Sequence, residues 1–167
     1  MKGGNDMNSF GTDKIEETVL KHADMIYRIA LQNVKNRADA EDIFQEVCLS
    51  LLVSDAPIND EVHIKRWLIR VTINKCNNFH KSYWNRNREP LSETLRTADD
   101  DSRELFALII NLPKSYRNLI YLYYYEGYTI KEIAEILEMN PNTVGSTLRK
   151  ARKKLRAYLT EGDEPNG

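Results

Sequence analysis

Basic side chains gather near the carboxyl end of the chain, in a stretch that contains no acidic residue. The stretch runs from Asn142 to Tyr158, and its six cations are Arg149, Lys150, Arg152, Lys153, Lys154 and Arg156. Guanidinium and ammonium groups are the donors that bind DNA phosphates and the base edges of the major groove. The chemistry that this stretch predicts is the binding of duplex DNA, and not the making or breaking of a covalent bond.

The same stretch has the periodicity of a helix that packs on one side only. At about 100° per residue, one narrow apolar stripe is formed by Val144, Leu148, Ala151 and Leu155. The residues away from this stripe are polar or basic, and those that we predict to contact DNA are Asn142, Thr143, Ser146, Arg149, Lys150 and Lys153. A packed inner stripe with outward donors is what a recognition helix requires.

A shorter helix and a turn precede this basic helix. Thr129 and Glu132 fit a capping box, in which the hydroxyl and the carboxylate satisfy backbone amides reciprocally. Asn140 then fits the N-cap of the basic helix, and Pro141 fits its first position, where a missing N–H is harmless. Residues 129–156 are therefore predicted to form a helix-turn-helix. The alternative is an αα-hairpin whose basic face is merely solvated.

A second basic segment lies in the middle of the chain, from His63 to Arg88, again without an acidic residue. Its seven cations are Lys65, Arg66, Arg70, Lys75, Lys81, Arg86 and Arg88. The net charge is nevertheless −1, because acids are grouped elsewhere, at Asp39, Glu41, Asp42, Glu46, Glu89, Glu93, Asp99, Asp100, Asp101 and Glu104. Segregated charge predicts two basic surfaces for a polyanion and acidic surfaces for a different partner.

The elements that must position these side chains are helices. Glycine and proline are scarce and no strand-like alternation persists, which favours an all-α fold of two small helical domains. We expect a disordered N-terminus over residues 1–13, a first domain over 14–82, a flexible acidic linker over 83–101, the helix-turn-helix domain over 102–160 and a disordered tail over 161–167.

The third helix of the first domain, predicted over residues 61–81, carries most of the second basic segment. We expect its core stripe to consist of Ile64, Leu68, Val71 and Phe79. By helical angle, its outward face holds Arg66, Arg70, Asn74, Asn77 and Lys81. In the second domain, helices over 102–111 and 114–125 are predicted to precede the helix-turn-helix.

Residues of other chemistry are few and isolated. Cys48 and Cys76 each lie in an apolar-periodic helical segment, which is typical of buried thiols in a reducing compartment. The three histidines share no ligand spacing with these cysteines, and no phosphate loop or nucleophile constellation occurs. We therefore expect no metal, no cofactor and no enzymatic activity.

The chain also shows no sign of export or of membrane insertion. No apolar run approaches the roughly 18 residues needed to span a bilayer, and the polar N-terminus is not a secretory signal. We expect a cytoplasmic protein with no membrane segment.

Several blocks, in order along the chain, resemble one family. LPK at 112–114 with Arg117, EGYTIKEIAE at 126–135 and TVGSTLRKAR at 143–152 resemble the promoter-reading C-terminal domain of sigma factors. DAEDIFQEV at 39–47 resembles the polymerase-binding helix of that family, and Trp67-Leu68 with Arg70 and Asn74 resembles its promoter-melting helix. Two matching domains joined by a short acidic linker resemble an extracytoplasmic-function (ECF) sigma factor.

The resemblance implies a partner for each charged surface. The acidic helix would dock on the clamp helices of the polymerase β′ subunit through Asp39, Glu41, Asp42, Gln45 and Glu46. The third helix and the loop after it would open the minus-ten promoter element through Arg66, Arg70, Asn74, Asn77, Lys81, Tyr83 and Trp84. The C-terminal helix would read the minus-thirty-five element. The family resemblance also implies an anti-sigma factor.

Two departures from the family pattern affect the expected readout. Gly145 stands where the family usually has a longer or basic side chain, and glycine inside a helix costs about 1 kcal/mol relative to alanine. Asn78 stands where family members often have aspartate.

Other function classes fit the sequence less well. A stand-alone regulator that binds operator DNA as a dimer is the alternative, but the two linked basic surfaces and the acidic helix disfavour it. An anti-sigma or adaptor protein would not need the basic recognition helix. An enzyme ranks last, because no catalytic constellation can be assembled.

Overall fold

The computed structural model describes residues 5–82 and 106–162, and the side chains of residues 11–79 and 106–160. All of the regular structure in these ranges is helical, so the predicted all-α fold is confirmed. The chain divides into two compact units, Met1–Asn87 and Arg88–Gly167. The predicted linker over 83–101, with Tyr83 and Trp84, lies outside the described residues.

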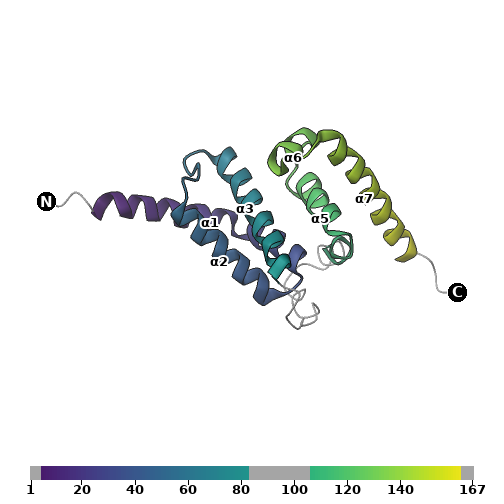
Figure 1. The fold of residues 1–167 in the computed structure, drawn as a ribbon, viewed down its shortest axis with the longest axis horizontal. Helices are drawn as coiled ribbons and strands as arrows, with labels where there is room; N and C mark the ends of the chain where they lie inside the picture. The colour runs from purple at the N-terminus through teal and green to yellow at the C-terminus, as the bar shows by residue number, and fades with distance from the viewer. Residues whose placement is uncertain (1–4, 83–105, 163–167) are drawn as a thin grey trace. The chain divides into compact units, whose positions relative to one another are not determined.

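The first unit is built from three helices that pack against one another in every pairing: α1 (Asn5–Val34), α2 (Arg37–Val53) and α3 (Glu61–Ser82) (Figure 1). Its core is aliphatic, and the side chains that bury most completely are Ile26, Ile29, Ala30, Ala40, Ile43, Val47, Leu68, Ile69 and Cys76. Ile43, Val47 and Leu51 lie every four residues along α2 and are buried, so one stripe of that helix faces the core.

Short-range bonds at the helix ends fix the two connections of this unit. Lys35 ends α1 in the left-handed conformation, with φ of 57°. Asn36 then caps α2, because its side chain accepts a hydrogen bond of 3.1 Å from the backbone N–H of Asp39. Asp60 caps α3 in the same way, accepting bonds of 3.1 and 3.0 Å from the N–H groups of Val62 and His63.

Two details of the first unit differ from the sequence prediction. Helix α1 begins at Asn5, although residues 1–13 were expected to be disordered. Its first turns project beyond α2 and α3 (Figure 1), and they are helical because elongation of an existing helix costs far less than nucleation. On α3, Val71 and Phe79 are only half-buried, whereas Ile69, Ile73 and Cys76 are buried. The stripe is displaced because α3 packs against both α1 and α2 and so buries a wider face.

The second unit contains α5 (Lys114–Ile120), the π-helix η2 (Tyr121–Tyr125), α6 (Ile130–Leu137) and α7 (Pro141–Gly162). Residues 106–110 before them are also helical. The predicted helix over 114–125 therefore changes type in its last turns, where Glu126 N–H donates to Tyr121 O at 3.2 Å. The core is again aliphatic, and its most buried side chains are Ile109, Leu119, Ile120, Leu122, Ile133, Ile136, Val144, Leu148 and Ala151.

One buried arginine joins two elements of this core. Arg117 on α5 donates from Nη1 to the carbonyl of Ile110 at 3.1 Å, and the arginine is almost wholly buried. The bond holds the end of the helix over 106–110 against α5. None of the described helices combines the length and the apolar character needed to cross a bilayer.

We predict that the core of the first unit depends on Leu68, whose side chain is fully buried on α3. Leu68→Ala should lower the free energy of unfolding by about 2–5 kcal/mol, because it leaves a cavity between three helices. Urea unfolding followed by circular dichroism measures this change. The matched control is Leu49→Ala on α2, where the side chain is 59% exposed and a change within about 0.5 kcal/mol is expected. Equal losses in the two variants would contradict the assignment of the core.

Candidate nucleic-acid interface

The first helix of the helix-turn-helix is held at its start by a reciprocal pair of hydrogen bonds. The Thr129 hydroxyl accepts from the N–H of Glu132 at 3.1 Å, and the Glu132 carboxylate accepts from the N–H of Thr129 at 2.8 Å. The predicted capping box is confirmed. Ile133, Ala134 and Ile136 of α6 are buried behind it, and α6 packs on α7.

The turn between α6 and α7 uses two different devices. Glu138 ends α6 in the left-handed conformation, with φ of 55°, and its N–H donates to the carbonyl of Ala134. Asn140 begins α7, because its side-chain oxygen accepts from the N–H of Asn142 at 2.9 Å, and Pro141 is the first helical residue. The predicted roles of Asn140 and Pro141 are confirmed, but nothing in the sequence marked Glu138.

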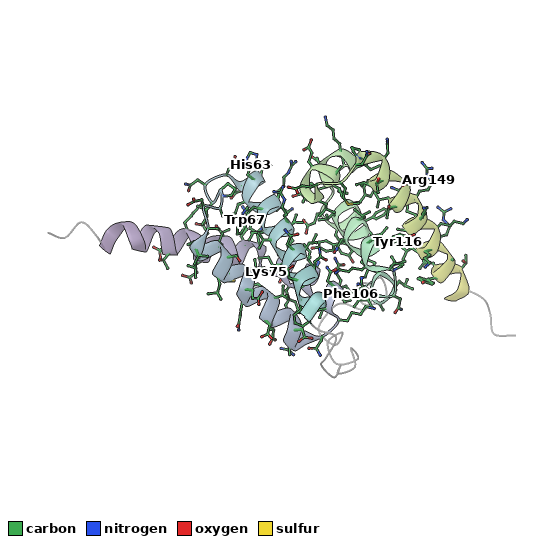
Figure 2. The ribbon with its side chains drawn as sticks, viewed as in Figure 1. His63, Trp67, Lys75, Phe106, Tyr116 and Arg149 are labelled. Atoms are coloured by element: carbon green, nitrogen blue, oxygen red, sulfur yellow. The ribbon has the colours of Figure 1, made fainter. Side chains whose placement is uncertain are left out.

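Helix α7 presents its predicted DNA face to solvent. Val144, Leu148 and Ala151 are buried. The six residues predicted to contact DNA are all exposed, namely Asn142, Thr143, Ser146, Arg149, Lys150 and Lys153. Ser146 also donates to the carbonyl of Thr143 at 3.1 Å, and Arg149 extends outward from the helix (Figure 2). One helix thus brings three amide or hydroxyl side chains and three exposed cations together. Lys154 and Arg156 are exposed as well, so Arg152 is the one half-buried cation among the six.

Gly145 lies on the flank of α7, between the buried stripe and the exposed face. A Cβ built at this position would meet a single side-chain atom outside the local backbone among the described residues, Ile130 Cδ1 at 3.8 Å. That distance is an ordinary van der Waals contact, so the fold has room for a side chain here. Glycine at this position therefore weakens the helix without relieving a clash.

Helix α3 carries the second basic surface, and its exposure is uneven. Asn74 is exposed, while Arg66, Arg70 and Asn77 are half-buried. The side chain of Lys81 lies outside the described residues, as do Tyr83 and Trp84.

Two further residues of α3, Trp67 and Asn78, lie on the same helix face as Arg70 and Asn74. Trp67, Arg70, Asn74 and Asn78 follow one another at intervals of three and four residues, the spacing at which side chains line one helix face. Trp67 is half-buried and Asn78 is exposed, and Figure 2 labels Trp67 on this helix. Sequence reasoning used Trp67 only as part of a motif, although the spacing already placed it beside Arg70 and Asn74.

The acidic face of α2 is continued by apolar side chains. Glu41, Asp42, Gln45 and Glu46 are exposed, and Asp39 is half-buried in the first turn. Glu41 also pairs with Arg37 at 3.1 Å. Toward the end of the helix the exposed residues become Leu49, Leu52 and Val53, which are 59%, 54% and 86% exposed. Sequence reasoning missed these three, although Leu49 and Leu52 continue the spacing of Asp42 and Gln45.

Ionisation is perturbed at a few described groups of the first unit. The N–H and the side chain of His63 lower the pKa of the exposed Asp60, which favours the capping carboxylate. A bond from Lys21, 2.6 Å long, lowers the pKa of Glu61. Burial raises the pKa of Tyr27 and that of the Cys48 thiol. The described residues hold no group of three or more His, Cys, Asp or Glu side chains that could hold a metal ion.

Comparison with known proteins assigns both units. The family model for sigma-70 region 2 matches residues 18–86, and that for sigma-70, region 4 matches residues 102–155. The RNA polymerase sigma factor SigV of Bacillus subtilis (strain 168) is 30% identical over 159 residues, which cover 87% of this chain and 90% of SigV. The chain belongs to the sigma-70 family of RNA polymerase sigma factors.

Further relatives define the class within the family. The ECF RNA polymerase sigma factor SigE of Mycolicibacterium smegmatis is 30% identical over 159 residues, covering 87% of this chain and 62% of SigE. The chain is an ECF sigma factor, and its region 2 includes the acidic face of α2 and the polar face of α3. Its region 4 includes α5, η2, α6 and most of α7.

Solved structures share the fold of this sigma factor. The sigma factor RpoE in complex with the anti-sigma factor NepR from Bartonella quintana aligns with a TM-score of 0.69 and 15% identity, covering 87% of this chain and 96% of that one. CnrH in complex with the cytosolic domain of CnrY aligns with a TM-score of 0.64 and 20% identity, covering 90% and 89%.

We predict that Gly145→Ala stabilises region 4 of this sigma factor by about 1 kcal/mol, because alanine is the better helix former and its Cβ meets only an ordinary contact. Thermal unfolding checks the change. Gly127→Ala is the matched control of opposite sign, since Gly127 has φ of 71° and a side chain there is strained. A loss of stability in Gly145→Ala would show that α6 and α7 cannot accept the added methyl group.

Proposed function

We propose that this sigma factor binds core RNA polymerase and directs transcription initiation at specific promoters through two DNA-reading surfaces. The observation that carries the proposal is the order of the two matched regions, each with a helix face of one sign of charge. The chemistry of RNA synthesis would belong to the polymerase, so this chain is proposed to be a dissociable factor and not an enzyme. Its place of action would be the cytoplasm.

Region 4 is proposed to read the minus-thirty-five element with α7. The N-terminal part of a recognition helix is the part that reaches base edges in the major groove, and here that part carries Asn142, Thr143 and Ser146. Arg149 and Lys150 lie one turn further and are proposed to reach guanine edges or phosphates. Lys153 would bind the backbone. Because all six side chains are exposed and share a helix, they support contact with a single groove.

Region 2 is proposed to open and bind the minus-ten element with α3. Arg66 and Arg70 would bind phosphates, and Asn74 and Asn77 would contact unpaired bases. Lys81, Tyr83 and Trp84 belong to the same proposed surface. To these we add Trp67, because it lies one helical turn before Arg70 on the side that carries exposed Asn74. Stacking of an unpaired base on an aromatic ring is worth about 1–3 kcal/mol.

The exposed face of α2 is proposed to dock on the clamp helices of the polymerase β′ subunit. Its acidic half, with Asp39, Glu41, Asp42, Gln45 and Glu46, would meet basic side chains. Its apolar half supports the same role, since Leu49, Leu52 and Val53 are large and exposed on one helix. Charge would orient the complex and apolar burial would stabilise it.

An anti-sigma factor is a further proposed partner. The structural neighbour RpoE was solved with the anti-sigma factor NepR, and two basic DNA-binding faces would need to be covered when the factor is idle. We propose that such a partner blocks promoter and polymerase binding in this chain.

The test of the function is run-off transcription with purified core polymerase and genomic DNA fragments. We expect the full chain to direct initiation at discrete fragments that core polymerase alone does not use. The stand-alone regulator is the competing outcome: tight binding to duplex DNA by the chain alone, with no initiation in the presence of core polymerase, would overturn the proposal.

A second prediction concerns the docking face of α2. Asp42→Arg should weaken binding to core polymerase by about tenfold or more, because it places like charges together in the interface. Affinity measured by fluorescence anisotropy of a labelled sigma factor checks this. Leu52→Ser, which removes an exposed apolar side chain, should weaken the same complex.

The matched control is Asp24→Arg, which makes the same charge change at an exposed position of α1. It should leave core binding close to that of the unmodified chain, and circular dichroism should show all three variants folded. Equal effects of Asp42→Arg and Asp24→Arg would mean that net charge, and not the α2 face, governs the affinity.

A further inference from the structure

Region 4 contains a cluster of aromatic rings built on the π-helix η2. Tyr121 is buried, donates from its hydroxyl to Glu126 Oε1 at 2.8 Å and stacks on Tyr125, with ring centroids 5.4 Å apart. Tyr123 and Tyr124 contact each other edge to face at 5.0 Å. Segments of π-helix are rare, and they often occur at functional sites. The position of these rings therefore needs an explanation beyond core packing, since Tyr124 remains exposed.

Arg152 of α7 contacts this cluster of aromatic rings. Its guanidinium carbon lies 4.9 Å from the centroid of the Tyr123 ring and 5.6 Å from that of Tyr124. Both distances are within the range of a cation–π interaction. Nε of Arg152 is buried and has no hydrogen-bond partner in the part of the chain that the structure describes. The rings hold the Arg152 cation in a half-buried position, whereas the other five cations of α7 are exposed to solvent.

Two consecutive tyrosines of the π-helix reach one guanidinium. Consecutive side chains of an α-helix diverge by about 100°, which would point the rings of Tyr123 and Tyr124 in different directions. Here the two rings instead meet edge to face at 5.0 Å, and both lie within reach of Arg152. The π-helical turn that carries them is closed by the bond from Glu126 N–H to Tyr121 O.

We propose that Arg152 is a positioning residue for DNA reading and not a DNA contact: its cation–π attachment to Tyr123 and Tyr124 fixes the orientation of α7. The proposal rests on the proposed function only in that α7 reads DNA. The buried stripe of Val144, Leu148 and Ala151 attaches α7 along one line. Arg152 adds an attachment on the flank of the helix, which resists rotation about that line.

The six cations of α7 would then have two roles: the exposed ones bind DNA, and Arg152 orients the helix. An exposed lysine that binds a phosphate contributes about 0.9 to the slope of log affinity against log salt. Arg152 should contribute nothing to this slope, because its guanidinium stays in contact with the Tyr123 and Tyr124 rings and does not bind a phosphate. It should instead contribute to sequence discrimination, since a misplaced recognition helix still binds phosphates but loses base contacts.

The experiment uses the full chain without polymerase and two duplexes: one that the unmodified chain selects from a random library, and one of scrambled sequence. Affinities are measured over a salt series. Arg152→Lys and Arg152→Gln should both lower the ratio of the two affinities about fivefold and leave the salt slope unchanged. Lys153→Gln, the comparator, should lower the slope by about 0.9. Because initiation is not measured, failure of the sigma function in run-off transcription leaves this result interpretable.

A double-mutant cycle ties the effect to the rings. Replacing Tyr123 and Tyr124 together by leucine should give the same loss of discrimination, and adding Arg152→Gln should cause no further loss. All variants are compared well below their melting temperatures, so that unfolding does not contribute. The proposal is overturned if Arg152→Gln lowers the salt slope while Arg152→Lys restores it. It is equally overturned if the leucine pair leaves the affinity ratio unchanged.

Discussion

Both units depend on one constraint: each charged helix must bury an apolar face firmly enough to hold side chains of like charge together on the other face. On α7, about two turns of helix expose Arg149, Lys150, Lys153, Lys154 and Arg156, which repel one another. Burial of Val144, Leu148 and Ala151 keeps this helix in place. On helix α2, burial of Ile43, Val47 and Leu51 likewise holds exposed carboxylates together on the opposite face. Aliphatic packing thus stabilises helices whose exposed faces carry a high density of like charge.

Local hydrogen bonds then determine where each of these helices begins. The capping box of Thr129 and Glu132 fixes the start of α6, and the side chain of Asn140 fixes that of α7. A cap of this kind contributes about 1 kcal/mol, which is small beside the burial of a core. Its importance is geometric, because a shift of one residue in the start of α7 would turn Ser146 and Arg149 by about 100°. The caps therefore set which side chains face the proposed groove.

Local signals of this kind are what made much of the fold predictable from the sequence. Thr129 bonds with Glu132 three residues on, Asn140 bonds with Asn142 two residues on, and the stripes of α2 and α7 each repeat within a single helix. What could not be predicted depends on partners distant in sequence. The contact of Tyr123 and Tyr124 with Arg152 joins η2 to α7, and no local pattern marks Arg152 as the half-buried cation. The displaced stripe of α3 likewise reflects two neighbouring helices.

Prediction of the exposed positions of α7 was limited in the same way, because a pattern within one helix carries no information about contacts with other elements. Periodicity placed the six proposed contacts of α7 on the exposed face, because helical angle alone decides that outcome. It could not distinguish Arg152 from Lys153, since both are cations one residue apart, and only the tyrosines of η2 separate them. The two residues then serve the proposed reading of DNA in different ways. A lysine on a solvated stem can follow a phosphate as it moves, whereas a planar guanidinium held over two tyrosine rings loses that freedom and gives a fixed orientation to the helix that carries it.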